Sequence, residues 1–293
     1  MSLFDSEFLK RLEYLSLVSK RMFRGQLLAQ RRTKQLGGGI EFADHREYSH
    51  GDDLRYLDWN VYARYGDLLL KRFQEEEDLH VYIMLDASPS MNVGQPSTKF
   101  DYARHVAAAL AYIALEDLDR VGIYAYSNEL IAEMPMTRGK DRVLSVLRFL
   151  DNLKTSGTRT DLARAIRALV NRAQRTGLVV IISDLFDQDG FKQGVDLLRH
   201  RRFEPHVVQL HTTDEAHPQM LGDVELQEVE TGELRKLTIT ERKLHQYAEL
   251  FQGFLAEIDA YCRAYSLSNT RATIDLPFDE LILRMMRAAG GVG

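Results

Sequence analysis

The sequence contains a single cysteine, Cys262, which excludes an internal disulfide and any metal site built from several cysteines. No apolar run approaches the roughly 18 residues that a membrane span needs. Residues 1–5 lack the basic start and apolar core of a secretory signal. The formal net charge of -5 gives no general case for nucleic-acid binding. These absences predict a cytoplasmic protein without a membrane span.

One stretch departs from this acidic balance. Residues 20–34 carry basic side chains with no acid among them, at Lys20, Arg21, Arg24, Arg31, Arg32 and Lys34. The stretch fits a solvated helix face or a surface that pairs with acids of this chain. A nucleic-acid-binding arm is disfavoured, because the aromatic side chains that stack on bases are scarce there.

From residue 79 onward, apolar runs of strand length alternate with helical patterns. This alternation predicts an α/β domain over 79–289, with a doubly wound, mostly parallel sheet flanked by helices. The run at 178–182 is the most apolar and is expected at the centre of the sheet. A β-hairpin insertion is expected at about 223–240. A long helix should follow, with Cys262 as a packing thiol on its apolar stripe, and then a last strand at 272–276.

Residues 1–78 are predicted to form an N-terminal helical and irregular extension. An apolar stripe from Phe8 to Val18 predicts a first helix. Residues 40–79 mix acids, arginines and aromatics without a clean period, so we expect this segment to lack a core of its own. It should lie across the larger domain, with arginine–carboxylate pairs fixing its path. The only tryptophan, Trp59, is expected to pack.

The stretch Asp86-Ala87-Ser88-Pro89-Ser90 follows the first apolar strand and precedes a helix. One carboxylate and two hydroxyls there are hard oxygen ligands that suit a small divalent cation. Two later stretches add Thr158, in a loop, and Asp184, at the end of the most apolar strand. In an open parallel sheet, ligands bind at the carboxyl ends of the strands, so these residues should converge.

Each of these residues also fits a purely local role. The two aspartates could cap strand ends, the two serines could be turn hydroxyls, and Thr158 could begin a helix. Thr160 is expected to cap the helix that follows it. All the ligand types together, on loops at one edge of the sheet, favour a metal site.

The set Asp86-x-Ser88-x-Ser90, Thr158 and Asp184 resembles the metal-ion-dependent adhesion site of von Willebrand factor type A domains. The resemblance implies that Ser88 and Ser90 coordinate the ion directly and that Thr158 joins them when a ligand is bound. It implies that Asp86 and Asp184 often act through water, and that a partner's Glu or Asp completes the octahedron. The implied cation is Mg²⁺, with Mn²⁺ or Ca²⁺ as possible substitutes.

A second resemblance covers residues 39–73, which look like the signature of the domain-of-unknown-function 58 proteins, a signature that precedes a von Willebrand A-like domain. Many relatives carry N-terminal membrane helices, and this chain resembles the short branch without them. The resemblance implies a MoxR-type AAA+ ATPase as partner and a chaperone-like or assembly role. The signature residues, whose role is either partner-facing or structural, are Arg46, Asp52, Asp53, Arg55, Asp58, Trp59 and Arg64.

Two functions of different classes follow. The first is a non-enzymatic, metal-dependent module that binds an acidic group of a protein partner, because the site is rich in neutral hydroxyls and has no evident base. The second is a metal-dependent hydrolase of phosphoesterase type, in which His50 or His105 would act near the ion. No ligand spacing or carboxylate connects either histidine with the site, so the first function is preferred.

Overall fold

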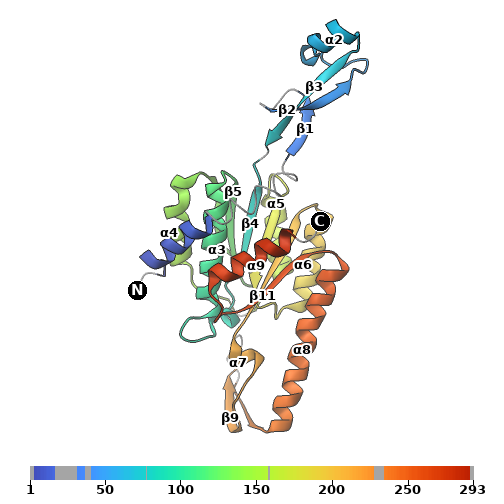
Figure 1. Cartoon of the computed structure of the whole chain (residues 1–293). Helices are drawn as coiled ribbons and strands as arrows, with labels where there is room; N and C mark the ends of the chain where they lie inside the picture. Colours follow the sequence, from blue (N-terminus) through green and yellow to red (C-terminus); the bar gives the residue numbers. More distant parts are fainter. Residues whose placement is uncertain are drawn as a thin grey trace. The chain divides into compact units, whose positions relative to one another are not determined.

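A six-stranded sheet, buried on both faces, forms the centre of the larger of two units into which the chain divides (Figure 1). The computed structural model describes residues 3–16, 32–36, 41–76, 78–157, 159–227 and 234–290. The larger unit, called the α/β unit below, comprises Met1–Ser19 and His80–Gly293, and the small unit comprises Lys20–Leu79. This division differs in one respect from the predicted one, which placed residues 1–78 in a single extension. The first helix belongs to the α/β unit and not to the small unit.

The sheet of the α/β unit is parallel except for one edge strand, β6, which pairs antiparallel with β5. The two most apolar strands, β4 and β7, are neighbours at its centre, as expected for β7. This confirms a mixed α/β unit with a mostly parallel sheet. In spatial order the strands are β11 (Ser268–Thr273), β8 (Glu204–His211), β7 (Leu178–Ser183), β4 (His80–Asp86), β5 (Arg120–Tyr126) and β6 (Leu130–Arg138).

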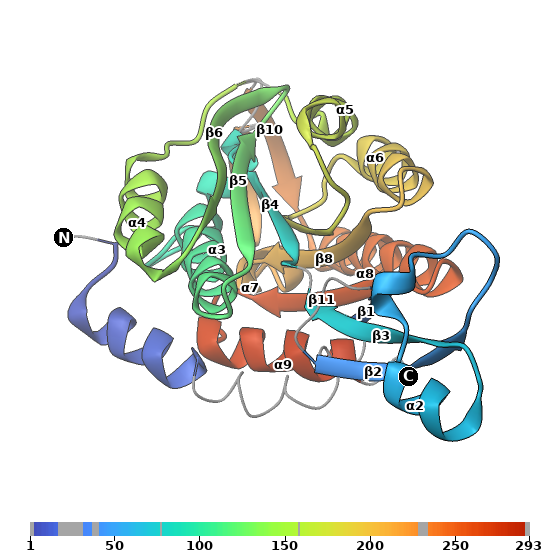
Figure 2. The same cartoon turned by 90° about the horizontal axis from the view of Figure 1, so that it is seen from above.

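Helices flank both faces of this sheet (Figure 2). One layer contains α3, α4 and α9, and the other contains α5, α6 and α8, which share a buried apolar cluster with the strands. The helices are α3 (Lys99–Glu116), α4 (Val143–Asn152), α5 (Leu162–Arg172), α6 (Gln188–His200), α7 (Thr213–Ala216), α8 (Glu241–Ala264) and α9 (Phe278–Gly290). Two 3₁₀ turns, η2 (Pro89–Asn92) and η3 (Lys140–Arg142), precede α3 and α4.

The predicted hairpin insertion is present. Strands β9 (Gly222–Gln227) and β10 (Leu234–Ile239) pair antiparallel between α7 and α8. Cys262 lies on the apolar stripe of α8 and is buried, and burial raises the pKa of its thiol to about 11. It is therefore the packing thiol that the sequence predicts.

The last strand was misplaced by sequence reasoning. The expected strand at 272–276 overlaps β11 only at residues 272 and 273, because β11 begins at Ser268 and ends at Thr273, and residues 274–276 form a turn. The first residues of β11 are polar, and an edge strand with one open side tolerates such residues. The side chains of Asn269 and Arg271 both donate hydrogen bonds to Asp259 of α8, so these polar residues have partners within the fold.

The first helix, over residues 6–16, packs on α3 and α9 through Phe8, whose ring lies 4.9 Å from those of both His105 and Phe278. Leu12 and Leu15 of the predicted stripe are buried too. Val18 lies outside the described residues, as do Gly37–Gly39 and residues 20–31 of the basic stretch.

The small unit contains a three-stranded antiparallel sheet, which the sequence pattern did not predict. In spatial order its strands are β1 (Arg32–Leu36), β3 (Leu69–Glu76) and β2 (Glu41–Glu47). The chain between β2 and β3 forms a 3₁₀ turn, η1 (Leu54–Tyr56), and a short helix, α2 (Trp59–Tyr65). Contrary to expectation, the segment has buried apolar residues of its own, Leu57 and Leu70, which are paired in an isolated bridge.

Candidate metal centre

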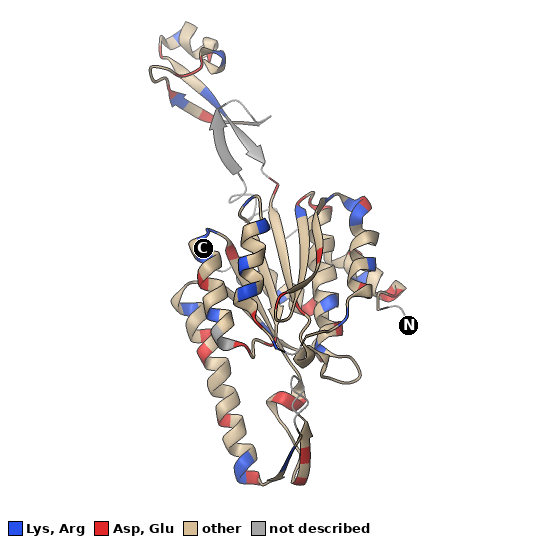
Figure 3. Cartoon of the chain, turned by 180° about the vertical axis from the view of Figure 1, so that it is seen from behind, with Lys and Arg blue, Asp and Glu red and all other residues tan. Residues whose placement is uncertain are grey.

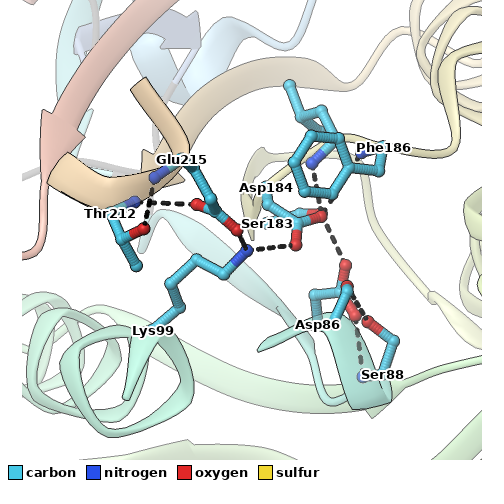
Figure 4. A network of polar contacts seen from close by, with 10 residues as sticks. Asp86, Ser88, Lys99, Ser183, Asp184, Phe186, Thr212 and Glu215 are labelled. Carbon is cyan, nitrogen blue, oxygen red and sulfur yellow. Dashed lines mark hydrogen bonds and ion pairs between the residues drawn. The ribbon is translucent and has the colours of Figure 1, made fainter. Parts of the chain in front are cut away.

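Strand β4 ends in the carboxylate that anchors the site. Asp86 is fully buried, and its Oδ1 accepts a hydrogen bond of 2.9 Å from the backbone N–H of Ser88. The Ser88 and Ser90 hydroxyl oxygens lie 3.0 Å apart. Pro89 fixes the first position of η2 between them. This tight turn brings together the first three residues of the predicted site, of which Asp86 and Ser88 are labelled in Figure 4.

Strand β7 ends beside β4 and adds two polar residues. The Ser183 hydroxyl donates to Asp86 Oδ2 at 2.5 Å and accepts the backbone N–H of Leu185 at 2.9 Å. Asp184 follows, nearly buried, and accepts the backbone N–H of Phe186 at 3.3 Å. Sequence reasoning found Asp184 but missed Ser183, although its position next to Asp184 at a strand end was a usable signal.

Lys99 is a further residue that sequence reasoning missed. Its side chain has no exposed surface, and Nζ donates to Asp184 Oδ2 at 2.8 Å and to Glu215 Oε1 at 2.5 Å (Figure 4). Nζ also lies 5.0 Å from the centre of the Phe186 ring. A lysine in the first turn of a helix opposes the helix dipole, and this oddity was a signal that Lys99 has a specific partner.

Glu215 is held in place by its own short helix. It forms a capping box with Thr212 at the start of α7: the Glu215 N–H donates to the Thr212 hydroxyl at 3.0 Å, and Glu215 Oε2 accepts the Thr212 N–H at 2.8 Å. Burial alone would lower the pKa of Lys99, but Asp184 and Glu215 more than offset this and raise it. The lysine is therefore a permanent cation beside Asp184.

Asp86, in contrast, has no cationic side chain among its contacts with the described residues. Burial, and then the charge of Asp184, raise the pKa of Asp86 to about 7, despite the hydrogen bonds from Ser183 and Ser88 that lower it. The neighbouring hydroxyl of Tyr126 is also buried and has no hydrogen-bond partner among the described residues. A buried carboxylate without a counter-charge, next to two converging hydroxyls, fits a divalent cation chemically.

The donor set limits how such an ion could be held. No group of three or more His, Cys, Asp or Glu side chains is arranged for a metal in the described part of the chain. An ion at this edge would therefore use the oxygens of Asp86, Ser88 and Ser90. Asp184 already bonds Lys99, and its remaining lone pairs are available to a water on the ion.

Thr158 lies outside the described residues, but the chain on either side of it belongs to the same edge of the sheet. The Ser156 N–H donates to the Ala87 carbonyl at 2.8 Å, and the Asp161 N–H donates to the Ser127 carbonyl at 2.9 Å. The helix α5 is capped by Asp161, whose carboxylate accepts the Arg164 N–H. The expectation that Thr160 caps this helix is therefore wrong.

The two histidines of the hydrolase alternative lie in different units, and the printed contacts of His105 include no residue of the proposed site. His105 lies among the aromatic rings of the first helix and α9, and its Nε2 is 2.9 Å from the Leu3 carbonyl oxygen. Burial lowers the pKa of His105. His50 lies on an exposed turn of the small unit.

Most of the charged signature residues form contacts within the small unit. Asp52 accepts Arg46 at 2.7 Å and the Ser49 N–H at 2.8 Å. Asp53 caps η1 and is bound by the Arg55 guanidinium through two nitrogens. Arginine–carboxylate pairs are therefore present as predicted, within the small unit, and the expectation that the segment lies across the larger domain stays a prediction.

Asp58 is the most buried acid of the signature. It caps α2 by accepting the N–H groups of Asn60 and Val61, and its other oxygen lies 2.9 Å from His45 Nε2 and 3.5 Å from Lys71 Nζ. The hydrogen bond with His45 is the largest of several contacts that lower the pKa of Asp58.

The remaining two signature residues, Trp59 and Arg64, are exposed on α2. Trp59 is 60% exposed and contacts the Tyr62 ring edge-on. The expectation that Trp59 packs in a core is therefore wrong, because it occupies the first residue of a helix that buries none of its side chains.

Comparison with known protein families matches residues 44–252 of the chain to the family described as "Protein of unknown function DUF58". An uncharacterized protein of Mycobacterium tuberculosis is 27% identical over 257 residues, which cover 87% of this chain and 81% of that protein. An uncharacterized protein of Mycobacterium avium is 32% identical over 102 residues, which cover 35% of this chain and 60% of that protein.

Solved structures of other proteins show a weak likeness. An aerotolerance-related membrane protein from Bacteroides fragilis has 15% identity and a TM-score of 0.48, covering 72% of this chain and 98% of that one. The conserved hypothetical protein BatB from Bacteroides thetaiotaomicron has 15% identity and a TM-score of 0.44, covering 71% and 99%. In the described part of this chain, no helix has the length and apolar character to cross a membrane. The cytoplasmic location stays a prediction.

Proposed function

The chain belongs to the DUF58 family, and we propose that it is a non-enzymatic module that binds an acidic group of a protein partner through a divalent cation. The proposed ligands are the oxygens of Asp86, Ser88 and Ser90, with Thr158 and Asp184 completing a site like the metal-ion-dependent adhesion site of von Willebrand factor type A domains. The proposed ion is Mg²⁺, with Mn²⁺ or Ca²⁺ as substitutes.

One observation carries this proposal. Asp86 is fully buried and contacts no cationic side chain in the described part of the chain, and the two serine hydroxyls lie next to it, 3.0 Å from each other. A divalent cation would supply the missing positive charge. Because the hydroxyls are neutral and Lys99 already offsets Asp184, the ion would keep much of its charge and attract a carboxylate from outside.

We propose a MoxR-type AAA+ ATPase as the partner, in a chaperone-like or assembly role. This part rests on the resemblance of residues 39–73 to the family signature rather than on the geometry of the site. The internal contacts of Arg46, Asp52, Asp53, Arg55 and Asp58 support a structural role for most of the signature. The exposure of Trp59 and Arg64 leaves these two residues as the partner-facing candidates.

The ion is tested first, by titrating Mn²⁺ into the purified protein and following its electron paramagnetic resonance signal. We expect the double substitution Ser88→Ala/Ser90→Ala to weaken Mn²⁺ binding by about tenfold or more, because it removes two direct oxygen ligands and no charge. The matched control is Ser145→Ala, an exposed hydroxyl on α4. Equal Mn²⁺ affinity in all three proteins would refute the metal site.

The partner is tested by surface capture of the purified MoxR-type ATPase from the same organism. We expect capture in Mg²⁺ and its loss in a chelator and in the Ser88→Ala/Ser90→Ala protein. Capture that is undiminished in the chelator would show that binding does not need the ion, and a metal-dependent turnover of phosphoesters would favour the hydrolase instead.

A further inference from the structure

A hollow of about 350 Å³ opens between the N-terminal ends of α5 and α6 in the α/β unit. Arg159, Arg164 and Arg167 are among its lining residues. Arg159 directly follows Thr158, and Asp187, at the other wall, comes three residues after Asp184. The hollow therefore lies at the same carboxyl edge of the sheet as the proposed metal site.

Small residues leave this space open. Ala163 and Gly190 line the hollow without long side chains. A side chain at Gly190 would place its Cβ 1.9 Å from Asp187 Oδ2, so only glycine allows Asp187 to cap α6 there. One turn further, a Cβ at Gly194 would lie 2.6 Å from the tip of Ile166, which shows how closely the two helices pack beneath.

The two acids at the hollow are occupied by backbone groups. Asp161 accepts the Arg164 N–H at 2.8 Å, while Asp187 accepts the Gly190 N–H at 3.0 Å and the Leu162 N–H at 3.1 Å. Both carboxylates thus neutralise the positive ends of the helix dipoles. They are not ion-paired with the arginine side chains of the hollow among the described residues.

The arginines differ in what they contact. Arg164 pairs with Glu129 at 3.0 Å, in a contact where both side chains are more than half exposed. Arg159 and Arg167 have no hydrogen-bond or ion-pair partner in the described part of the chain, and both are exposed. The helix α5 contains arginines and no acidic residue, and its ribbon carries only blue bands in Figure 3. The hollow therefore presents two unused guanidinium groups.

We propose that this arginine-lined hollow binds a second acidic side chain of the protein partner, on the same segment whose first carboxylate the metal holds. This inference rests on the proposed function and adds that the partner's segment carries two acidic residues. A guanidinium binds a carboxylate through two parallel N–H···O bonds, which fixes orientation as well as charge. Asn128 and Gln193, which also line the hollow, carry amide side chains that are suited to hold the adjoining peptide.

The experiment measures binding of synthetic peptides to the full-length protein by NMR titration. One peptide carries a single glutamate in a glycine–serine background, and a matched set carries two glutamates at increasing spacing. We expect the best two-glutamate peptide to bind about tenfold more tightly than the single-glutamate peptide in Mg²⁺, as charge-assisted hydrogen bonds allow. Arg159→Gln/Arg167→Gln should abolish this gain, whereas Arg148→Gln, an exposed position on α4, should leave it.

The outcomes separate the two proposals. If the second glutamate adds nothing at any spacing, or if Arg148→Gln reduces binding as much as the double variant does, the arginine site is refuted while the metal site stands. If a chelator leaves binding of the two-glutamate peptide unchanged but the double arginine variant abolishes it, the arginine site is supported and the metal-dependent function is refuted. If neither peptide binds at millimolar concentration in Mg²⁺, both are refuted.

Discussion

The carboxylates of the small unit and the carboxylate at the end of β4 are in opposite electrostatic environments. In the small unit, a backbone N–H and then Arg46 lower the pKa of Asp52, and the Arg55 side chain lowers that of Asp53. At the sheet edge, burial and the charge of Asp184 raise the pKa of Asp86 to about 7. The first environment favours the charged form and the second opposes it.

The difference separates structural acids from candidate functional ones. The acids of the small unit satisfy backbone N–H groups and arginines, so their charge helps to fix the local chain path. Burying Asp86 without a cation costs free energy that the rest of the fold must offset. Perturbed carboxylates of this second type cluster at functional sites, which is the reason for placing the function at the sheet edge.

The largest expected effect on stability comes from Lys99, the buried cation that bonds Asp184 and Glu215. Lys99→Met should destabilise the protein by about 4 kcal/mol, because removing one partner of a buried ion pair leaves the other charge uncompensated. The measurement is urea unfolding at pH 7, followed by circular dichroism. Adding Asp184→Asn to Lys99→Met should recover part of this loss, since the uncompensated charge then disappears.

The matched control is Lys140→Met. Lys140 Nζ lies 2.6 Å from Glu116, a distance similar to those of Lys99, but the Lys140 side chain is 57% exposed. Its removal should cost less than about 1 kcal/mol, as for other surface ion pairs. If the two lysine variants lost equal stability, the contrast between a buried and an exposed charge would not hold for this chain.

Sequence reasoning predicted which side chains lie close together where their proximity depends on local spacing or on general sheet topology. Asp86, Ser88 and Ser90 converge because they share one turn, and Asp184 joins them because β4 and β7 are parallel neighbours. Lys99 was missed because Glu215, one of its two partners, is 116 residues away and is brought near by tertiary structure alone.

The sheet of the small unit was missed for a different physical reason. Its strands β2 and β3 do not alternate apolar and polar residues, so they lack the usual period of a half-buried strand. They are joined across the pair by charge instead, with Arg72 bound to Asp44 through two nitrogens at 2.7 and 2.9 Å. Hydrophobic periodicity cannot detect pairing of this kind.

A smaller effect on stability is expected when pH is lowered, because the α/β unit contains a buried histidine, His206. Burial lowers the pKa of His206 on β8 to about 4, and its ring contacts the Thr270 hydroxyl at 3.2 Å. Above the unfolded pKa of about 6.5 the histidine is neutral in both the folded and the unfolded state, so its titration does not change the free energy of unfolding. As pH falls below 6.5, only the unfolded chain takes up the proton, so stability should drop by about 3 kcal/mol by pH 4.

This drop is measured as the difference between the pH profiles of the wild-type protein and His206→Gln, each from urea unfolding. The variant loses some packing at every pH, but its stability should fall less steeply between pH 6.5 and 4. His200→Gln, at an exposed position near the end of α6, should keep the wild-type slope. Parallel profiles for all three proteins would show that His206 is not held neutral by burial.

The smallest effect is expected in the small unit, where the charge of an acid favours local structure. Asp58→Ala removes the cap of α2 and the contact with His45, and should speed amide hydrogen exchange in α2 about fivefold. Exchange in β4 and β7 should not change, because these strands belong to the other unit.

The control is Arg55→Gln, which removes an ion pair whose arginine side chain is 81% exposed. It should alter the exchange of neither region. Faster exchange in β4 after Asp58→Ala would mean that the acids of the small unit support the α/β unit as well, and the contrast between structural and functional carboxylates would then have to be drawn within one cooperative structure.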